Sequence, residues 1–345
     1  MLKLKLRILV CGPSNISVDN IVERLSSHKI PILRLGHPAR LLPSVVNHSL
    51  DVLTRTSDAA QIVQDVRKEM DDRMSTLKKT RNRKEKNVIY DDIRQLRKEF
   101  RQREEACVTN LVGGSKVVLA TLHGAGGFQL KREEFDVVII DEASQALEAQ
   151  CWVPLIRGKK VVLAGDHLQL PPTIKSLNSK QKVKSADIQG IIPGMTLETT
   201  LFDRLLAMHG PDIKRMLTTQ YRMHETIMRF PSDALYDAKL IAAESVKARL
   251  LKTLPYELEE TEDTIEPLVF WDTQGGDFPE RSEEEEIGKK PGKGLMSDSK
   301  SNPMEAGLVR LQVKKLVDAG VKAEDIGVLS PYNAQVSHTP TPAQI

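Results

Sequence analysis

Two adjacent carboxylates, Asp141 and Glu142, directly follow the apolar run Val137–Ile140. The run is β-branched, too short for a helix and too apolar for a half-exposed strand, so we expect a central strand of a parallel sheet, covered on both faces. Ligands of such sheets sit beyond the carboxyl ends of the strands. One carboxylate could hold Mg²⁺ through water while the other orients a nucleophilic water, as hydrolysis of a phosphoanhydride requires. The alternative is a strand that simply ends in solvated acids.

A third carboxylate, Asp166, follows a second β-branched run, and Gln169 lies three residues beyond it. Gln169 could bond the attacking water or an oxygen of a γ-phosphate, although a plain turn before two prolines is the alternative. Further along, Tyr221 and Arg222 offer a flat ring for a base and a fixed cation for phosphate charge. A cluster that packs at an interface explains this pair equally well.

The glycine turn at Gly12, between a short strand and the predicted helix Ile16–Ser27, is typical of a phosphate-binding loop. A P-loop there would need Gly, Lys and Ser or Thr at positions 17 to 19, which hold Ser, Val and Asp, and no other glycine has the required spacing. The turn could instead offer Ser14, Asn15 and the first N–H groups of the helix to a nucleic-acid phosphate. An ordinary strand-to-helix turn is the alternative.

Alternating strand and helix patterns predict an α/β protein with two parallel-sheet domains, the second incomplete. We expect the first domain over residues 1–208, with a helical insert at about 50–110. The second covers 209–336, with strands at 268–271 and 326–329, a mobile loop at about 274–301 and an unstructured tail at 337–345. A net charge of +3 restricts any basic surface to local patches. No signal peptide or bilayer-spanning stretch is predicted.

The insert reads as a helical hairpin, because apolar residues recur at helical spacing in two stretches. These residues are Ile62, Val66, Met70, Met74 and Leu77 in the first stretch, and Ile89, Ile93, Leu96 and Phe100 in the second. The tip between them is basic and carries Arg81, Arg83, Lys84 and Lys86. These cations could meet a phosphate backbone, or they could be a solvated face.

Four motifs occur in order: Asp141–Gln145, Gly165–Pro172, Gln220–His224 and Ser330–Asn333. Together they resemble the superfamily-one helicases of the Upf type. The segments Pro13–Asn20 and Leu33–Arg40 are similar to those of the immunoglobulin mu-binding protein (SMUBP-type) helicases specifically. The resemblance runs from about residue 6 to residue 336 and implies two RecA-like domains, with ATP in the cleft between them and single-stranded DNA or RNA across the top.

The resemblance also implies roles for individual positions. Asp141 would hold Mg²⁺, Glu142 would activate water, Gln169 would read the γ-phosphate, Tyr221 would stack on adenine and Arg222 would act as an arginine finger. The residues that match the family's grip on the nucleic-acid backbone are Pro13, Ser14, Asn15 and Thr121. A monomer in the nucleus and cytoplasm, with possible ribonucleoprotein or ribosome-associated partners, is what the family implies.

The chain departs from the family at two motifs. Family members carry a Walker A loop upstream of the Pro-Ser-Asn motif and a later Gly-Arg-Glu motif, and neither occurs in these 345 residues. We therefore expect a fragment, truncated at both ends, of an ATP-dependent 5′–3′ helicase. The fragment should hydrolyse little or no ATP, because without the P-loop the phosphates lose most of their ligands. The alternatives are a catalytically inactive nucleic-acid-binding fragment and a protein-interaction module built on the hairpin.

Overall fold

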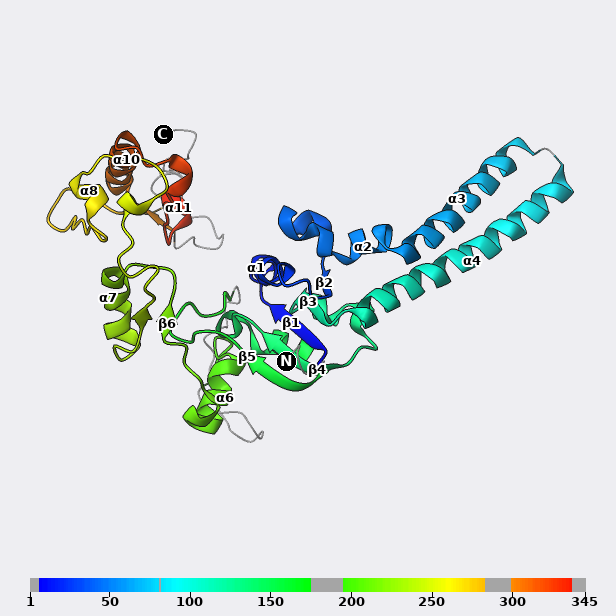
Figure 1. Cartoon of the computed structure of the whole chain (residues 1–345), viewed down its shortest axis with the longest axis horizontal. Helices are drawn as coiled ribbons and strands as arrows, with labels where there is room; N and C mark the ends of the chain where they lie inside the picture. The colour runs from blue at the N-terminus through cyan, green and yellow to red at the C-terminus, as the bar shows by residue number, and fades with distance from the viewer. Residues whose placement is uncertain (1–5, 81, 175–194, 283–298, 337–345) are drawn as a thin grey trace. The chain divides into compact units, whose positions relative to one another are not determined.

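The computed structural model describes residues 6–80, 82–174, 195–282 and 299–336. The chain forms two compact units, Met1–Arg215 and Met216–Ile345, which are described separately below (Figure 1). Most of the loop expected at 274–301 and all of the tail expected at 337–345 lie outside the described residues. Within the described part, no helix combines the length and the apolar character needed to cross a bilayer.

The first unit is built on a five-stranded sheet in the order β2-β3-β1-β4-β5, in which every neighbouring pair is parallel. Its strands are β1 (Ile8–Gly12), β2 (Ile32–Leu35), β3 (Val117–Thr121), β4 (Phe135–Ile140) and β5 (Gly158–Leu163). Its helices are α1 (Asn15–Ser26), α2 (Leu50–Thr56), α3 (Asp58–Lys79), α4 (Arg83–Gly114), α5 (Glu148–Leu155) and α6 (Leu201–His209). The predicted α/β class with a parallel sheet is confirmed.

Each face of the sheet has its own apolar core, because side chains alternate along a strand. One core combines alternate residues of β1, β3 and β4 with Val112 from the end of α4 and Leu201 from α6. The other core joins the remaining alternate residues to Val18 and Val22 of α1. The central strands β1, β3 and β4 are therefore covered on both faces, as predicted for Val137–Ile140, and their carboxyl ends are held rigidly at one edge.

Strand β5 differs from the central strands because it pairs with β4 at the edge of the described sheet. Its residues Val161 and Val162 are 44 % and 39 % exposed. The β-branched residues still form a strand, since β4 supplies one row of hydrogen-bonding partners. Its position at the edge does not explain this exposure, since β2, at the opposite edge, is buried throughout; the faces of β5 are less covered by the described elements than those of β2.

The predicted helical hairpin is present between β2 and β3, as the antiparallel helices α3 and α4 (Figure 1). The two helices enclose a small apolar core made of Met70, Ile89 and Ile93. Ile62 lies in α3, as predicted, but its side chain is 50 % exposed and does not belong to this core. Arg81, at the tip, lies outside the described residues.

The described residues of the second unit contain little sheet. They form β6 (Thr219–Gln220), β7 (Ile241–Ala242), β8 (Arg281–Ser282), β9 (Lys300–Ser301), α7 (Glu225–Leu235), α8 (Glu262–Ile265), α10 (Pro303–Asp318) and α11 (Asn333–Val336). The strands form two separate pairs, β6 with β7 and β8 with β9. The prediction of strands at 268–271 and 326–329 was wrong, because both segments are irregular in the structure. Neither segment forms ladder hydrogen bonds with a described strand, so β propensity alone does not order them.

Candidate active site

The candidate carboxylates lie at the end of β4, where backbone hydrogen bonds hold the chain. The Asp141 N–H donates to the carbonyl oxygen of Cys11 at 2.8 Å, which ties the strand end to β1. Asp141 is half-buried. Burial raises the pKa of its carboxyl above the ordinary value, against a hydrogen bond from the Glu142 N–H that lowers it. A divalent cation at this carboxylate would favour the ionised form.

Glu142 does not continue the strand but turns sharply out of it. Its φ of 51° and ψ of 39° lie in the left-handed region, which is uncommon for a residue other than glycine. Such a conformation costs roughly 1–3 kcal/mol and tends to cluster at functional sites. The turn leads directly into the short 3₁₀ helix Ala143–Gln145.

The loop after β5 packs directly against this turn. The N–H of Ala143 donates to the carbonyl oxygen of Ala164 at 2.8 Å, and the N–H of Asp166 donates to Ser144 Oγ at 3.1 Å. Gly165 permits this approach, since a Cβ there would lie 3.0 Å from the nitrogen atoms of both Ala143 and Ser144. The turns after β4 and β5 thus form one continuous rim at the carboxyl edge of the sheet.

The third predicted carboxylate and the glutamine lie on this rim and pair with each other. Gln169 Nε2 donates to Asp166 Oδ2 at 2.9 Å, and the Gln169 side chain is exposed. Asp166 also accepts a hydrogen bond from the Leu168 N–H, which closes the turn. The structure therefore brings Asp166 and Gln169 to the same sheet edge as Asp141 and Glu142.

The four residues predicted to grip nucleic acid lie at neighbouring strand ends. Gly12 and Thr121 are paired across β1 and β3, which places Thr121 next to the turn that carries Pro13, Ser14 and Asn15. Ser14 begins α1 as its N-cap, and its hydroxyl oxygen accepts the Ser17 N–H at 3.1 Å. Thr121 Oγ1 accepts the Gly124 N–H at 3.1 Å.

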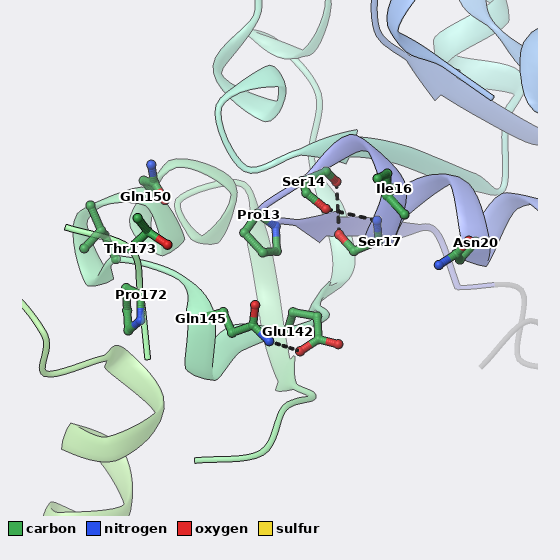
Figure 2. A pocket seen from close by; sticks show the side chains of 11 residues that line it. Pro13, Ser14, Ile16, Ser17, Asn20, Glu142, Gln145, Gln150, Pro172 and Thr173 are labelled. Atoms are coloured by element: carbon green, nitrogen blue, oxygen red, sulfur yellow. Dashed lines mark hydrogen bonds between the residues drawn. The ribbon is translucent and has the colours of Figure 1, made fainter. Parts of the chain in front are cut away.

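A hollow of about 470 Å³ joins the start of α1 to the carboxylate turn (Figure 2). Ser14 and Ser17 line one side, and Glu142 lines the other with Gln145, whose Nε2 donates to Glu142 Oε2 at 3.1 Å. Of the described residues that line it, Glu142 alone carries a charge. No role was predicted for Gln145, although its spacing of three residues from Glu142 on a tight turn is a signal that could have indicated one.

Carboxylates are suitable ligands for Mg²⁺, which commonly takes one or two of them and completes its shell with water and phosphate oxygens. Asp141 fits that demand as a single protein ligand, and no group of three metal-binding side chains exists among the described residues that would hold a metal without a substrate. The phosphate part of a nucleotide fits less well. The lining contributes no cation, and the 345 residues contain no P-loop pattern.

In the second unit, Tyr221 and Arg222 lie on a loop between β6 and α7, and both are exposed, Tyr221 at 73 %. The neighbouring Gln220 builds the loop. Its Oε1 accepts the N–H groups of Arg222 and Met223 at 2.8 and 2.9 Å, and its Nε2 donates to the Met223 carbonyl oxygen at 2.8 Å. His224 then caps α7 by accepting the Thr226 N–H on Nδ1 at 3.0 Å. No role was predicted for the Gln220 side chain.

Known proteins resemble the chain along almost its whole length. Two family models, each described as an AAA domain, match residues 2–177 and 197–340. DNA polymerase alpha-associated DNA helicase A of Schizosaccharomyces pombe is 49 % identical over 331 residues, which cover 96 % of this chain and 46 % of that protein. DNA-binding protein SMUBP-2 of Rattus norvegicus is 47 % identical over 335 residues, 96 % of this chain and 31 % of that protein.

A more distant relative is the regulator of nonsense transcripts 1 homolog of Neurospora crassa, which is 31 % identical over 335 residues, 96 % of this chain and 26 % of that protein. The chain spans about half, or less, of the length of these curated relatives. The first family model alone covers more than half of the 345 residues. Together with the motifs on the rim of the sheet, these matches mean that the chain belongs to the AAA domain family, among the Upf-type and SMUBP-type helicases.

Proposed function

We propose that the chain is part of an ATP-dependent helicase that couples ATP hydrolysis to 5′–3′ movement along single-stranded DNA or RNA. The relatives named as DNA helicases support this proposal. The 5′–3′ direction of movement is proposed from the family resemblance alone. We further propose that the protein acts as a monomer in the nucleus and cytoplasm, where ribonucleoprotein or ribosome-associated partners would fit an RNA substrate.

The observation that carries the proposal is the shared hollow, because Ser14 of the candidate nucleic-acid turn and Glu142 of the candidate hydrolytic turn line the same cavity (Figure 2). A strand that contacts Ser14 or Asn15 would press on the first turn of α1. The same turn borders Glu142 and its partner Gln145. Nucleic acid and the hydrolytic carboxylate can therefore affect each other through a few side chains, without a long pathway.

In this proposal the chain's own residues divide the work of hydrolysis. Bound Mg²⁺ would neutralise phosphate charge, with Asp141 as its protein ligand. Glu142 would orient the attacking water, and Gln169, now turned to Asp166, would hydrogen-bond the γ-phosphate. From the second unit, Tyr221 would stack on adenine and Arg222 would stabilise the charge that develops on the phosphates.

The 345-residue chain itself is proposed to bind nucleic acid with little or no hydrolysis. Glu142 is the one charged side chain among the described residues of the hollow, and a carboxylate repels phosphate. Pro13, Ser14, Asn15 and Thr121 nevertheless gather at two adjacent strand ends, where hydroxyl, amide and N–H groups can contact a phosphate backbone. Nucleic-acid binding without turnover is thus the second candidate function.

The test measures two properties of the purified chain. The first is ATP turnover with Mg²⁺, with and without single-stranded oligonucleotide, for the wild type and Glu142→Gln. We expect equal, background rates. The second is oligonucleotide binding between 50 and 200 mM salt, which should weaken as salt increases.

The possible results separate the two candidates. Oligonucleotide-stimulated turnover that disappears in Glu142→Gln would refute the expected inactivity and support the helicase directly. Salt-dependent binding at background turnover would support the second candidate. If the chain binds no oligonucleotide at any salt concentration, the Pro13–Asn15 turn does not bind nucleic acid, either as part of a helicase or as part of a binding fragment without turnover.

A further inference from the structure

Arg34 is a fully buried cation in β2, at 0 % exposure, and it lies beside the nucleic-acid turn. Its Nε donates to Asp19 Oδ1 of α1 at 2.7 Å, and Asp19 is 1 % exposed. Burying two charges is costly unless they are paired and fully hydrogen-bonded. Neither the carboxylate rim nor the hollow contains this pair, so its place in the fold needs another explanation.

The remaining bonds of the pair connect three segments. Arg34 Nη2 donates to Asn15 Oδ1 at 2.9 Å, and Nη1 donates to the carbonyl oxygen of Leu35. The second oxygen of Asp19 accepts the Leu42 N–H at 2.9 Å. The guanidinium therefore links β2 to α1 and to the turn after β1. It also joins Pro13–Asn20 to Leu33–Arg40, the two segments that are similar to those of the SMUBP-type helicases.

The chemistry of Arg34 decides how Asn15 is oriented. An arginine side chain has only donors, so it can bond only the oxygen of the Asn15 amide. With Oδ1 turned to Arg34, the NH₂ group must point away from it. Asn15 then presents two N–H donors, which suit phosphate oxygens, instead of a carbonyl oxygen, which would repel them.

We propose that Arg34, paired with Asp19, is a positioning residue that fixes the Asn15 amide as a hydrogen-bond donor to the phosphate backbone of single-stranded nucleic acid. This inference rests on the proposed function of the Pro13–Asn15 turn. Arg34 does not touch the nucleic acid, since it is enclosed by protein. It acts through the side chain of Asn15.

Gly36 supports a fixed place for the guanidinium. A Cβ at Gly36 would lie 3.2 Å from Arg34 Nη1 and 3.2 Å from Leu41 Cδ2, both closer than ordinary contact. The chain after β2 therefore passes directly over the guanidinium. Arg34 has little room to move away from Asn15.

The experiment measures binding of a fluorescent oligothymidylate to the 345-residue chain by anisotropy, between 50 and 200 mM salt. One variant is Asn15→Ala. A second, Arg34→Met with Asp19→Asn, removes both charges and keeps an acceptor for the Leu42 N–H. A third combines all three changes. Val22→Ala is the matched control, because it weakens the core beneath the same helix without touching Asn15.

We expect Asn15→Ala and the charge-pair variant each to weaken binding by about tenfold, the effect of losing one hydrogen bond to a charged group. The combined variant should bind no more weakly than either, because all act through one contact. Val22→Ala should bind like the wild type below its melting temperature. The slope of log affinity against log salt should stay unchanged, whereas losing a cation that contacts phosphate would reduce it by about 0.7 for a single strand.

Each contrary result has a distinct meaning. A wild type that binds no oligonucleotide refutes the proposed function and leaves nothing to position. If Asn15→Ala weakens binding but the charge-pair variant binds like the wild type, Arg34 does not position Asn15. Losses that multiply in the combined variant, an altered salt slope, or an equal loss in Val22→Ala would each overturn the proposal as well.

Discussion

The two units use the same kind of apolar sequence with opposite results. In the first, the run Val137–Ile140 lies between two other strands, and Val138 and Ile140 are completely buried. In the second, the segment 268–271 reads like a strand, yet Phe270 is 86 % exposed and the segment is irregular. An apolar run thus specifies a strand only where other strands complete its hydrogen bonds and cover its faces.

The candidate site residues differ between the units in the same way. Asp141, Glu142 and Asp166 lie on turns held by main-chain bonds between strand ends. Tyr221 and Arg222 lie on a loop held largely by the side chain of Gln220. Rigidity at the first site therefore comes from the sheet, while at the second it depends on a single amide group.

The largest expected difference comes from truncating one leucine in each unit. Leu9 is 0 % exposed in β1, so Leu9→Ala should cost about 3 kcal/mol of unfolding free energy through lost burial and a residual cavity. Leu329 is 96 % exposed, and Leu329→Ala should change it by less than about 0.5 kcal/mol. Hydrogen exchange followed by mass spectrometry reports each unit separately.

Equal losses for the two leucines would show that the segment 326–329 packs as a strand in solution. That result would remove the contrast between the units. If Leu9→Ala proved harmless, the sheet itself would not be the stable part of the first unit.

Much of the first unit could be predicted from sequence, because short, continuous β-branched runs are typical of the strands of a parallel sheet that is covered on both faces. The meeting of Asp141, Asp166 and Gln169 was predictable for the same reason, since parallel strands end at one edge. The left-handed turn at Glu142 was not, because its backbone conformation depends on packing between two loops. The bonds of Arg34 and Gln220 were hidden as well, since they join side chains to partners that only the folded chain brings together.

A glycine in each unit gives the second test, with effects of opposite sign. A methyl group at Gly165 would crowd the nitrogen atoms of Ala143 and Ser144 at 3.0 Å, so Gly165→Ala should destabilise by about 1–2 kcal/mol and loosen the rim. Gly307 lies within α10, and a Cβ there meets no described atom within 4 Å. Gly307→Ala should stabilise by about 0.5–1 kcal/mol through helix propensity. Thermal unfolding followed by hydrogen exchange measures both.

A stabilising Gly165→Ala would mean that the turns after β4 and β5 are not in close contact. Destabilisation by Gly307→Ala would mean that α10 has a partner on that side, and the second unit would then be more tightly packed than the contrast implies.

The smallest effect on global stability is expected at the loop of the second unit, where Gln220→Ala removes the acceptor of two N–H groups. Exchange at the amides of Arg222 and Met223 should accelerate about tenfold, which corresponds to the loss of roughly one hydrogen bond, about 1.4 kcal/mol. Global stability should change little, since the loop is exposed. Gln220→Glu is the matched control. It keeps an acceptor for both N–H groups but puts a carboxylate oxygen against the Met223 carbonyl oxygen in place of the donor, so the two amides should exchange more slowly than in Gln220→Ala. Equal exchange in both variants and the wild type would show that the loop owes its order to contacts other than Gln220, and the proposed dependence of Tyr221 and Arg222 on one amide group would be wrong.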